Sequence, residues 1–149
     1  MSDNLITIAC PHCHRKNRLP ASRLREASRC GACKQALFTG HPVTLDAASF
    51  ASHSQSDLPL VVDFWAPWCG PCRQFAPVFE AAAQQMEPGL RFGKINTEEQ
   101  QALAAQFAIR SIPTLMIFRQ GRELARLSGA LPPEQFRQWI AQALASAGA

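Results

Sequence analysis

The sequence has 149 residues, of which 47% are hydrophobic and 17% are charged. This length allows one ordinary domain, or one domain of about 100 residues with a small appendage, in a soluble globular protein. No apolar run reaches the roughly 18 residues that a membrane span needs, and the start, MSDNLITIAC, lacks the features of a signal peptide. We therefore expect a cytoplasmic protein with no membrane anchor. In that compartment, paired cysteines more often bind metal or do redox chemistry than form structural disulfides.

Charge is unevenly distributed along the chain. The first 41 residues hold seven Lys or Arg against two acidic residues, a charge of +5, whereas the remainder carries −1. Residues 39–42, Thr-Gly-His-Pro, are typical of a short connector. We therefore place a boundary there, between a segment over residues 1–40 and a domain over residues 41–149.

The N-terminal segment cannot fold by burial alone. Its one strand-like run is residues 5–9, and it has few other large apolar residues. About 35 residues bury too little surface to offset the loss of conformational entropy, so the segment needs a cross-link or a metal.

Alternating strands and helices are predicted after residue 43. A nearly continuous apolar run, residues 60–66 (LVVDFWA), is typical of a strand buried on both faces of a sheet. The pattern then predicts a helix over 74–86 that is kinked at Pro77, followed by a strand over 90–95. A second helix is expected to begin with Thr97 as its cap and to end near residue 107. Strands over 114–118 and 123–127, joined by a turn at Gly121, come next, and Pro133 opens the last helix. This order predicts an α/β fold with a central mixed sheet and helices on both faces.

The motif Trp-Cys-Gly-Pro-Cys, residues 68–72, falls where the buried strand ends and a helix begins. Pro71 fits the first turn of a helix, because its missing N–H has no intrahelical partner there. Cys69 then lies at the helix N-terminus, where free N–H groups and the helix dipole favour a thiolate and lower its pKa. Cys69 is therefore the expected nucleophile, and Cys72, one turn further on, can close a disulfide with it.

An aspartate interrupts the buried run at position 63. Burying an ionised carboxylate costs several kcal/mol unless it is paired or its pKa is raised, and a raised pKa suits a general base near neutral pH. The alternative is a strand-end Asp63 satisfied by a hydrogen bond. The default interpretation of Lys94 is a solvated charge, and that of Pro113 is a turn before a strand. We expect Trp68 to be exposed beside the nucleophile.

Two more Cys-X-X-Cys pairs lie in the N-terminal segment, with sixteen residues between them. This spacing is typical of a zinc site with four thiolate ligands, which is closed to catalysis and supplies the missing cross-link. Two extra redox couples or a pair of disulfides are the alternatives. The predicted ligands are Cys10, Cys13, Cys30 and Cys33. We expect His12 and His14 to be bystanders, and the sequence suggests no partner for His41 or His53.

Four stretches, VVDFWAPWCGPC, FGKINTEE, IRSIPTLMIF and LSGAL, occur in the order and spacing that resemble the thioredoxin family, over roughly residues 43–147. The resemblance implies that Cys69 forms a mixed disulfide with substrate, that Cys72 resolves it, and that Asp63 accepts the proton of Cys72, with Lys94 nearby. It also implies a cis peptide bond before Pro113 and a substrate-binding surface made by Trp68, Gly70, Pro71, Ile112, Pro113 and Gly129. The four-cysteine segment ahead of such a domain is similar to the zinc-containing bacterial thioredoxins of the thioredoxin-2 type.

The resemblance implies a monomeric reductant of protein disulfides that an NADPH-dependent, flavin-containing thioredoxin reductase recycles. One alternative makes the zinc segment a partner-binding module. Nucleic acid is an unlikely partner for it, because no aromatic residue is interleaved with the basic ones and four thiolates on Zn²⁺ cut the local charge to about +3. A further alternative is a redox sensor, in which oxidation of the thiolates releases zinc and unfolds the segment.

Overall fold

The computed structural model describes residues 4–148, and its centre is one five-stranded mixed sheet. The strand order is β3-β5-β4-β6-β7. β3 and β4 run parallel to β5, whereas β6 is antiparallel to both β4 and β7. The strands are β3 (Val43–Thr44), β4 (Leu60–Trp65), β5 (Arg91–Asn96), β6 (Thr114–Arg119) and β7 (Arg122–Ser128).

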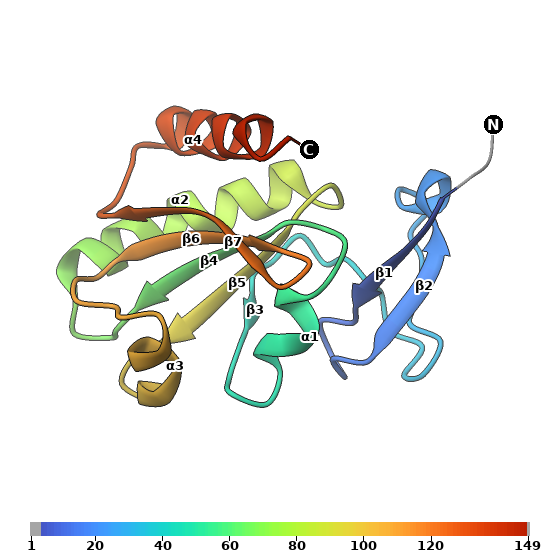
Figure 1. The fold of residues 1–149 in the computed structure, drawn as a ribbon, viewed down its shortest axis with the longest axis horizontal. Coiled ribbons are helices and arrows are strands. Elements are labelled where there is room, and N and C mark those ends of the chain that lie inside the picture. Colours follow the sequence, from blue (N-terminus) through green and yellow to red (C-terminus); the bar gives the residue numbers. More distant parts are fainter. Residues whose placement is uncertain (1–3, 149) are drawn as a thin grey trace.

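Helices cover both faces of this sheet (Figure 1). The helices are α1 (Phe50–Ser54), α2 (Gly70–Met86), α3 (Gln101–Gln106) and α4 (Pro133–Ser146). The pair α2 and α4 lies over one face, and α1 and α3 lie over the other. The predicted α/β arrangement with a mixed sheet is therefore confirmed.

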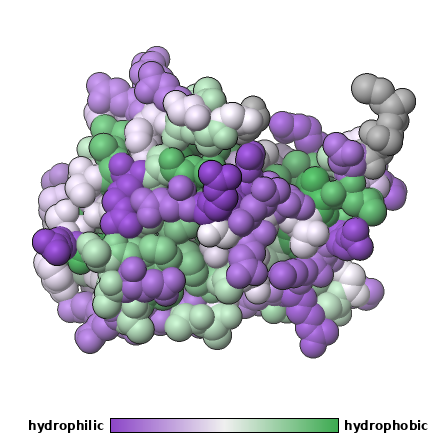
Figure 2. Space-filling view, in the orientation of Figure 1, coloured by the Kyte–Doolittle hydropathy of each residue, from purple (hydrophilic) through white to green (hydrophobic). Residues whose placement is uncertain are grey.

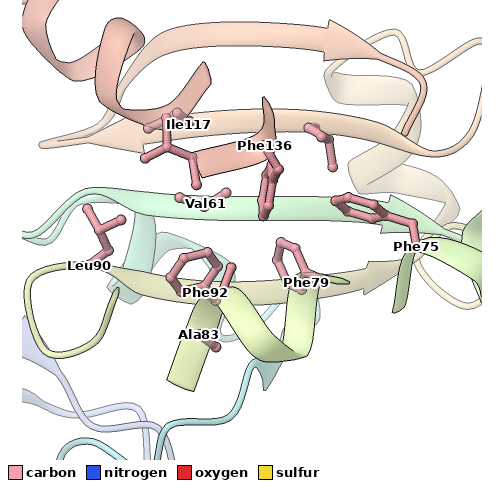
Figure 3. Close-up of a cluster of buried hydrophobic side chains, with 11 residues drawn as sticks. Val61, Phe75, Phe79, Ala83, Leu90, Phe92, Ile117 and Phe136 are labelled. Carbon is pink, nitrogen blue, oxygen red and sulfur yellow. The ribbon is translucent and has the colours of Figure 1, made fainter. Parts of the chain in front are cut away.

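Side chains alternate between the two faces along the central strand β4. Val61 packs with Phe75, Phe79 and Phe136 of α2 and α4, and Figure 3 shows these rings gathered against the sheet. Val62 and its neighbours of the same parity pack on the opposite face, against α1 and α3. Because successive residues of a strand point to opposite faces, Asp63 shares the α2 face with Val61.

The N-terminal segment forms a separate two-stranded antiparallel hairpin, β1 (Leu5–Ala9) and β2 (Lys16–Pro20), followed by a 3₁₀ turn, η1 (Ala21–Arg23). We call residues 4–40 the ribbon. The strand over 5–9 is confirmed. The sequence does not predict β2, because Lys-Asn-Arg-Leu-Pro has one large apolar residue and a proline. Figure 1 shows the ribbon at one end of the sheet and the start of α2 at the other.

The ribbon packs firmly on the rest of the chain. The Asp57 N–H donates to Thr7 O at 2.9 Å, and the Thr7 N–H donates to the Asp57 carboxylate at 2.7 Å. Leu58 lies in the same buried cluster as Ile8, Leu19 and Leu37 of the ribbon. Leu58 therefore contributes to the hydrophobic core of the ribbon, although it follows the connector.

Several elements differ from the predictions. Thr97 does not cap α3, which begins at Gln101; its hydroxyl donates instead to Trp65 O at 3.0 Å. The short elements α1 and β3 are not predicted. The hairpin turn is confirmed and is made by Gln120 and Gly121, both with positive φ (52° and 78°).

Polar and apolar side chains are interspersed on the face drawn in Figure 2, with hydrophobic surface at the ribbon end. Two large hydrophobic side chains are markedly exposed among the described residues, Leu5 at 56% and Trp68 at 64%. Within residues 4–148, none of the helices combines the length and apolar character that crossing a membrane requires.

Candidate active site and metal centre

The first turn of α2 positions the Cys69–Cys72 pair. Cys69 is the N-cap residue, with an extended backbone, and its sulfur accepts the Cys72 N–H at 3.2 Å. The two cysteines are joined by a disulfide, with their Cα atoms 5.2 Å apart. Pro71 occupies the first turn, as the motif predicts. In the reduced form, this N–H and the helix dipole favour negative charge on the Cys69 sulfur.

The loop before β6 and the end of β7 meet at the same point. The Ile112–Pro113 peptide bond is cis, as expected, and Ile112 O lies 3.8 Å from the Cys69 sulfur. The Gly129 N–H donates to Pro113 O at 2.8 Å. Gly129 has φ of 109°, a backbone conformation that glycine adopts without a steric penalty. The fold thus places Ile112 beside Cys69 and joins Pro113 to Gly129.

The surface beside the disulfide is open. Trp68 is 64% exposed, and its indole N–H donates to the Glu98 carboxylate at 2.7 Å. No heavy atom beyond its chain neighbours and helix backbone would lie within 4 Å of a Cβ built on Gly70, so this position also faces open space. A shallow cavity of about 290 Å³ adjoins Pro71, with Phe75, Val78 and Leu131 among its lining residues. The surface beside the disulfide is therefore both open and partly apolar.

Asp63 is a buried carboxyl group on β4, on the face of the sheet that α2 covers. It is 1% exposed, and neither of its carboxylate oxygens has a hydrogen-bond partner among the described residues. Burial raises its pKa to about 7, and Lys94, its neighbour across the β4–β5 pairing, acts in the opposite direction. The Lys94 ammonium lies 4.7 Å from the centre of the Trp65 ring. Among the described residues, none supplies the hydrogen bond that the alternative interpretation of Asp63 requires.

The four ribbon cysteines form one cluster. Their sulfur atoms all lie within 4.8 Å of one another, and the distances across the two pairs, Cys10 to Cys33 and Cys13 to Cys30, are both 3.6 Å. A tetrahedron with metal–sulfur bonds of about 2.3 Å has edges of about 3.8 Å. Four convergent sulfurs at this separation, each placed as a free thiol, fit a zinc ion.

The two halves of the cluster are built by the same backbone turn. In each turn, the backbone N–H of the first cysteine donates to the carbonyl of the residue five positions later. The carbonyl of that same cysteine accepts from the N–H of the residue four positions later. The residue after the second cysteine has positive φ, 64° for His14 and 68° for Lys34. The bonds are 2.9 Å and 3.0 Å in both turns and join Cys10 to Arg15 and His14, and Cys30 to Gln35 and Lys34.

Hydrogen bonds to the sulfurs distinguish the two turns. Cys30 Sγ accepts backbone N–H groups at 3.3 and 3.5 Å and also the Asn17 side-chain N–H at 3.4 Å. The N–H of Cys33, together with Asn17, lowers the pKa of the Cys30 thiol to about 5. Cys10 Sγ accepts two backbone N–H groups, but burial raises the pKa of its thiol to about 11. Sequence reasoning missed Asn17, which no local pattern distinguishes from a surface residue of a polar strand.

The histidines take other partners than the sulfurs. His14 Nδ1 lies 3.0 Å from Nε2 of His53, which is buried, and burial lowers the pKa of His53 to about 3. His12 Nε2 lies 3.1 Å from Ala36 O, and His41 Nδ1 lies 2.6 Å from the Glu80 carboxylate. In the described part of the chain, the only group of convergent ligand atoms is the four-sulfur cluster, which contains no histidine.

Comparisons with known proteins agree with both sites. A family model described as thioredoxin matches residues 41–142, and one described as thioredoxin 2, N-terminal, matches residues 9–35. Thioredoxin C-3 of Corynebacterium nephridii is 44% identical over 138 residues, 92% of this chain and 94% of that protein. Thioredoxin 1 of a Nostoc species is 51% identical over 85 residues, 57% of this chain and 79% of that protein.

Solved structures lead to the same family. A mutant thioredoxin from Halobacterium salinarum superposes with a TM-score of 0.64 at 26% identity, covering 70% of this chain and 92% of that one. The thioredoxin of Malassezia sympodialis gives 0.62 at 32% identity, covering 66% of this chain and 87% of that one. The chain therefore belongs to the thioredoxin family of protein-disulfide oxidoreductases and carries the N-terminal zinc-ribbon segment of the thioredoxin-2 type.

Proposed function

We propose that this protein reduces disulfide bonds of other proteins in the cytoplasm through Cys69 and Cys72, and that an NADPH-dependent thioredoxin reductase recycles it. One observation carries the proposal. The Cys69 sulfur lies at the N-terminus of α2, accepts the Cys72 N–H, and sits 3.8 Å from Ile112 O beside a cis-proline and an open surface. That arrangement offers both an activated thiolate and a place for an extended substrate backbone.

The reaction is a pair of thiol–disulfide exchanges. The Cys69 thiolate attacks one sulfur of the substrate disulfide, which forms a mixed disulfide and releases the other substrate sulfur as a thiolate. The Cys72 thiolate then attacks the Cys69 sulfur, closes the Cys69–Cys72 disulfide and releases the second substrate thiolate. Two electrons pass from the dithiol to the substrate, and the reductase later returns two electrons from NADPH.

Asp63 serves as the proton acceptor for Cys72 in the second exchange. Cys72 is 2% exposed, so bulk water does not reach its thiol readily. Asp63 lies on the α2 face of the sheet, and its pKa of about 7 lets it take up a proton near neutral pH. Lys94 tunes this carboxylate electrostatically and does not touch the reacting sulfurs in our proposal.

The substrate lies along the surface around Cys69. The Ile112 backbone seats an extended substrate chain next to Pro113, and Gly129 keeps the opposite side free of side-chain bulk. Trp68, Gly70 and Pro71 form the remainder of the contact surface. This surface selects accessible disulfides in a flexible segment, because Cys69 is only 5% exposed.

The ribbon holds one structural zinc ion through Cys10, Cys13, Cys30 and Cys33. When bound, zinc supplies the cross-link that the small hairpin lacks. Cys10 and Cys30 are 0% and 1% exposed, which suits a closed site. Four thiolates persist as metal ligands in a reducing compartment, and this supports the cytoplasmic assignment.

A coupled assay tests the redox function. The wild-type protein, a flavin-containing thioredoxin reductase and a protein disulfide substrate are mixed, and NADPH oxidation is followed. We expect turnover with wild type and none with Cys69→Ser, while Cys72→Ser accumulates a mixed disulfide that mass spectrometry detects. Turnover by Cys69→Ser would contradict the proposal.

The exposure of two ligands favours a second role for the ribbon, as a redox-responsive site. Cys13 and Cys33 are only half-buried, and each lies 3.6 Å from a sulfur of the other turn. Two equivalents of hydrogen peroxide would take four electrons from the four thiolates, giving two disulfides, water and free zinc. Peroxide that oxidises Cys69 and Cys72 but leaves zinc fully bound would exclude this role.

A titration with DNA and RNA, in which we expect no salt-dependent binding, tests the partner-binding alternative.

A further inference from the structure

We call residues 41–148 the redox domain, and we propose that one of its residues, Arg91, is a positioning residue for the zinc centre of the ribbon. Arg91 is the first residue of β5, and in the sequence it follows the connector, whereas all four ribbon cysteines precede it. The inference rests on the proposed zinc site and adds to it a partner outside the ribbon.

The guanidinium of Arg91 lies at the junction of the ribbon and the sheet. Arg91 is 3% exposed, and its Nη2 donates to Ala9 O at 2.8 Å. Its Cζ lies 4.4 Å from the centre of the Phe38 ring. Ala9 immediately precedes Cys10, and Phe38 follows the second cysteine turn, so one side chain contacts the chain beside both halves of the metal site.

A buried cation at this position requires negative charge nearby. Glu87 is its nearest carboxylate, at 3.7 Å, but Arg91 Nη1 and Glu87 Oε2 are both buried without a hydrogen-bond partner among the described residues. Burial raises the pKa of Glu87, so this carboxylate is itself costly to ionise. An imperfect pair of this kind repays little of the cost of desolvating two charges.

The zinc centre supplies the missing negative charge. Four thiolates around Zn²⁺ carry a net charge of −2, and one of them, Cys10, directly follows Ala9, whose carbonyl accepts from Arg91. The cation therefore stabilises the loaded site, and its hydrogen bond fixes the backbone at the entrance to the first cysteine turn. The second turn is held differently, by Asn17, which accepts the Gly31 N–H at 2.9 Å and donates to the Cys30 sulfur.

Linkage makes this coupling reciprocal. If Arg91 favours bound zinc, then bound zinc favours the docked position of Arg91 and of the ribbon by the same free energy. Zinc binding and docking of the ribbon on Arg91 are thus thermodynamically coupled.

Zinc retention in full-length variants tests the proposal. Arg91→Met keeps the apolar stem and removes the charge and the donors. We expect its apparent zinc affinity, measured by competition with a chromophoric chelator, to fall about tenfold or more, as is usual for partners outside the ligand set. Arg91→Lys should recover part of this loss because it keeps the charge. The thiolate-to-metal charge-transfer band of the cobalt form should shift in Arg91→Met.

Arg126→Met is the matched control. Arg126 also donates to a backbone carbonyl, Phe107 O at 2.6 Å, and pairs with a carboxylate, Glu123, and among the described residues neither of these partners belongs to the ribbon. Its removal should leave zinc affinity and the cobalt spectrum unchanged. Wild-type zinc affinity in Arg91→Met, whatever its thermal stability, would overturn the proposal.

A second variant decides the question if Arg91→Met does not fold. Glu87→Gln removes the competing negative charge and leaves the cation in place, so zinc affinity should rise severalfold. Unchanged or weaker affinity in Glu87→Gln would then overturn the proposal. Absence of zinc from the wild-type protein would instead refute the metal site itself, which separates the two failures.

Discussion

The redox domain and the ribbon contain the same Cys-X-X-Cys spacing and use it in opposite ways. After Cys72 the chain continues as a helix, so Cys69 caps the helix N-terminus and its sulfur accepts the Cys72 N–H. After Cys13 and after Cys33 the chain reverses through a residue with positive φ, so the sulfurs of two turns converge. The backbone that follows the second cysteine, rather than the spacing, decides whether a pair makes a nucleophile or half of a metal site.

Exchange of serine for cysteine in each region should give the largest contrast. Cys69→Ser should lower reductase-coupled turnover to background and leave one zinc per chain, because the nucleophile is lost and the ribbon is untouched. Cys30→Ser should lose zinc and keep most of the turnover, because the active site lies at the other end of the sheet. Metal analysis and the NADPH assay on both variants check this; equal loss of turnover in both would show that the regions are not separable.

Removal of zinc should destabilise the ribbon and leave the sheet of the redox domain folded. Structural zinc contributes roughly 10 kcal/mol or more of apparent binding free energy in small metal-dependent folds. We therefore expect chelation to abolish hydrogen-exchange protection of the β1 and β2 amides and to leave the β4 amides protected. Ribbon amides that stay protected in metal-free protein would show that docking on Asp57 and Leu58 suffices to fold the hairpin.

The buried carboxyl group of Asp63 makes the redox domain sensitive to pH. Its pKa is about 7 in the folded protein against an ordinary value of 3.8. Between these values the folded chain holds a proton that the unfolded chain has released, so stability falls as pH rises through this window. The loss is on the order of 4 kcal/mol. Asp63→Asn removes this dependence of the free energy of unfolding on pH. The free energy of unfolding of the variant should therefore exceed that of wild type by an amount that grows from pH 4 to pH 8.

Denaturant unfolding at several pH values measures this difference, with Asp57→Asn as the control for a carboxyl group at the ribbon junction. An Asp63→Asn advantage that is the same at pH 4 and pH 8 would contradict a raised pKa. Resolution of the mixed disulfide should also slow in this variant, because Cys72 loses its proton acceptor.

Trp68 should show the smallest effect on stability. Its side chain is 64% exposed, so Trp68→Ala should change the free energy of unfolding by less than about 0.5 kcal/mol. We expect KM for a protein disulfide to rise while kcat changes little, because the ring contacts substrate and not the reacting sulfurs. The control is Glu98→Gln, which keeps a hydrogen-bond acceptor for the indole; an unchanged KM in Trp68→Ala would remove Trp68 from the substrate surface.

Local sequence patterns predict the elements that carry the redox chemistry. The buried run of β4 and the proline in the first turn of α2 predict both elements and the position of Cys69 between them. The pattern fails where tertiary contacts stabilise an element. β2 has little apolar character of its own and forms because its Leu19 enters a core that Leu58 completes.

The same reason explains which site residues the sequence does not indicate. Arg91 stands at the start of an ordinary strand pattern, and only the fold shows that it is buried under the ribbon. His53 lies in a short helix without a clear apolar stripe, and its partner His14 is 39 residues away. Long-range polar pairs of this kind leave no periodic signal.

The position of Leu58 has a consequence for how such a protein can change during evolution. Excision of the ribbon at its connector would expose the side chains of Leu58 and Arg91, which the ribbon covers. Loss or gain of the ribbon during evolution must therefore be accompanied by substitutions at such positions in the redox domain. A segment that can be gained or lost as one piece of a gene can still share buried side chains with the rest of the protein.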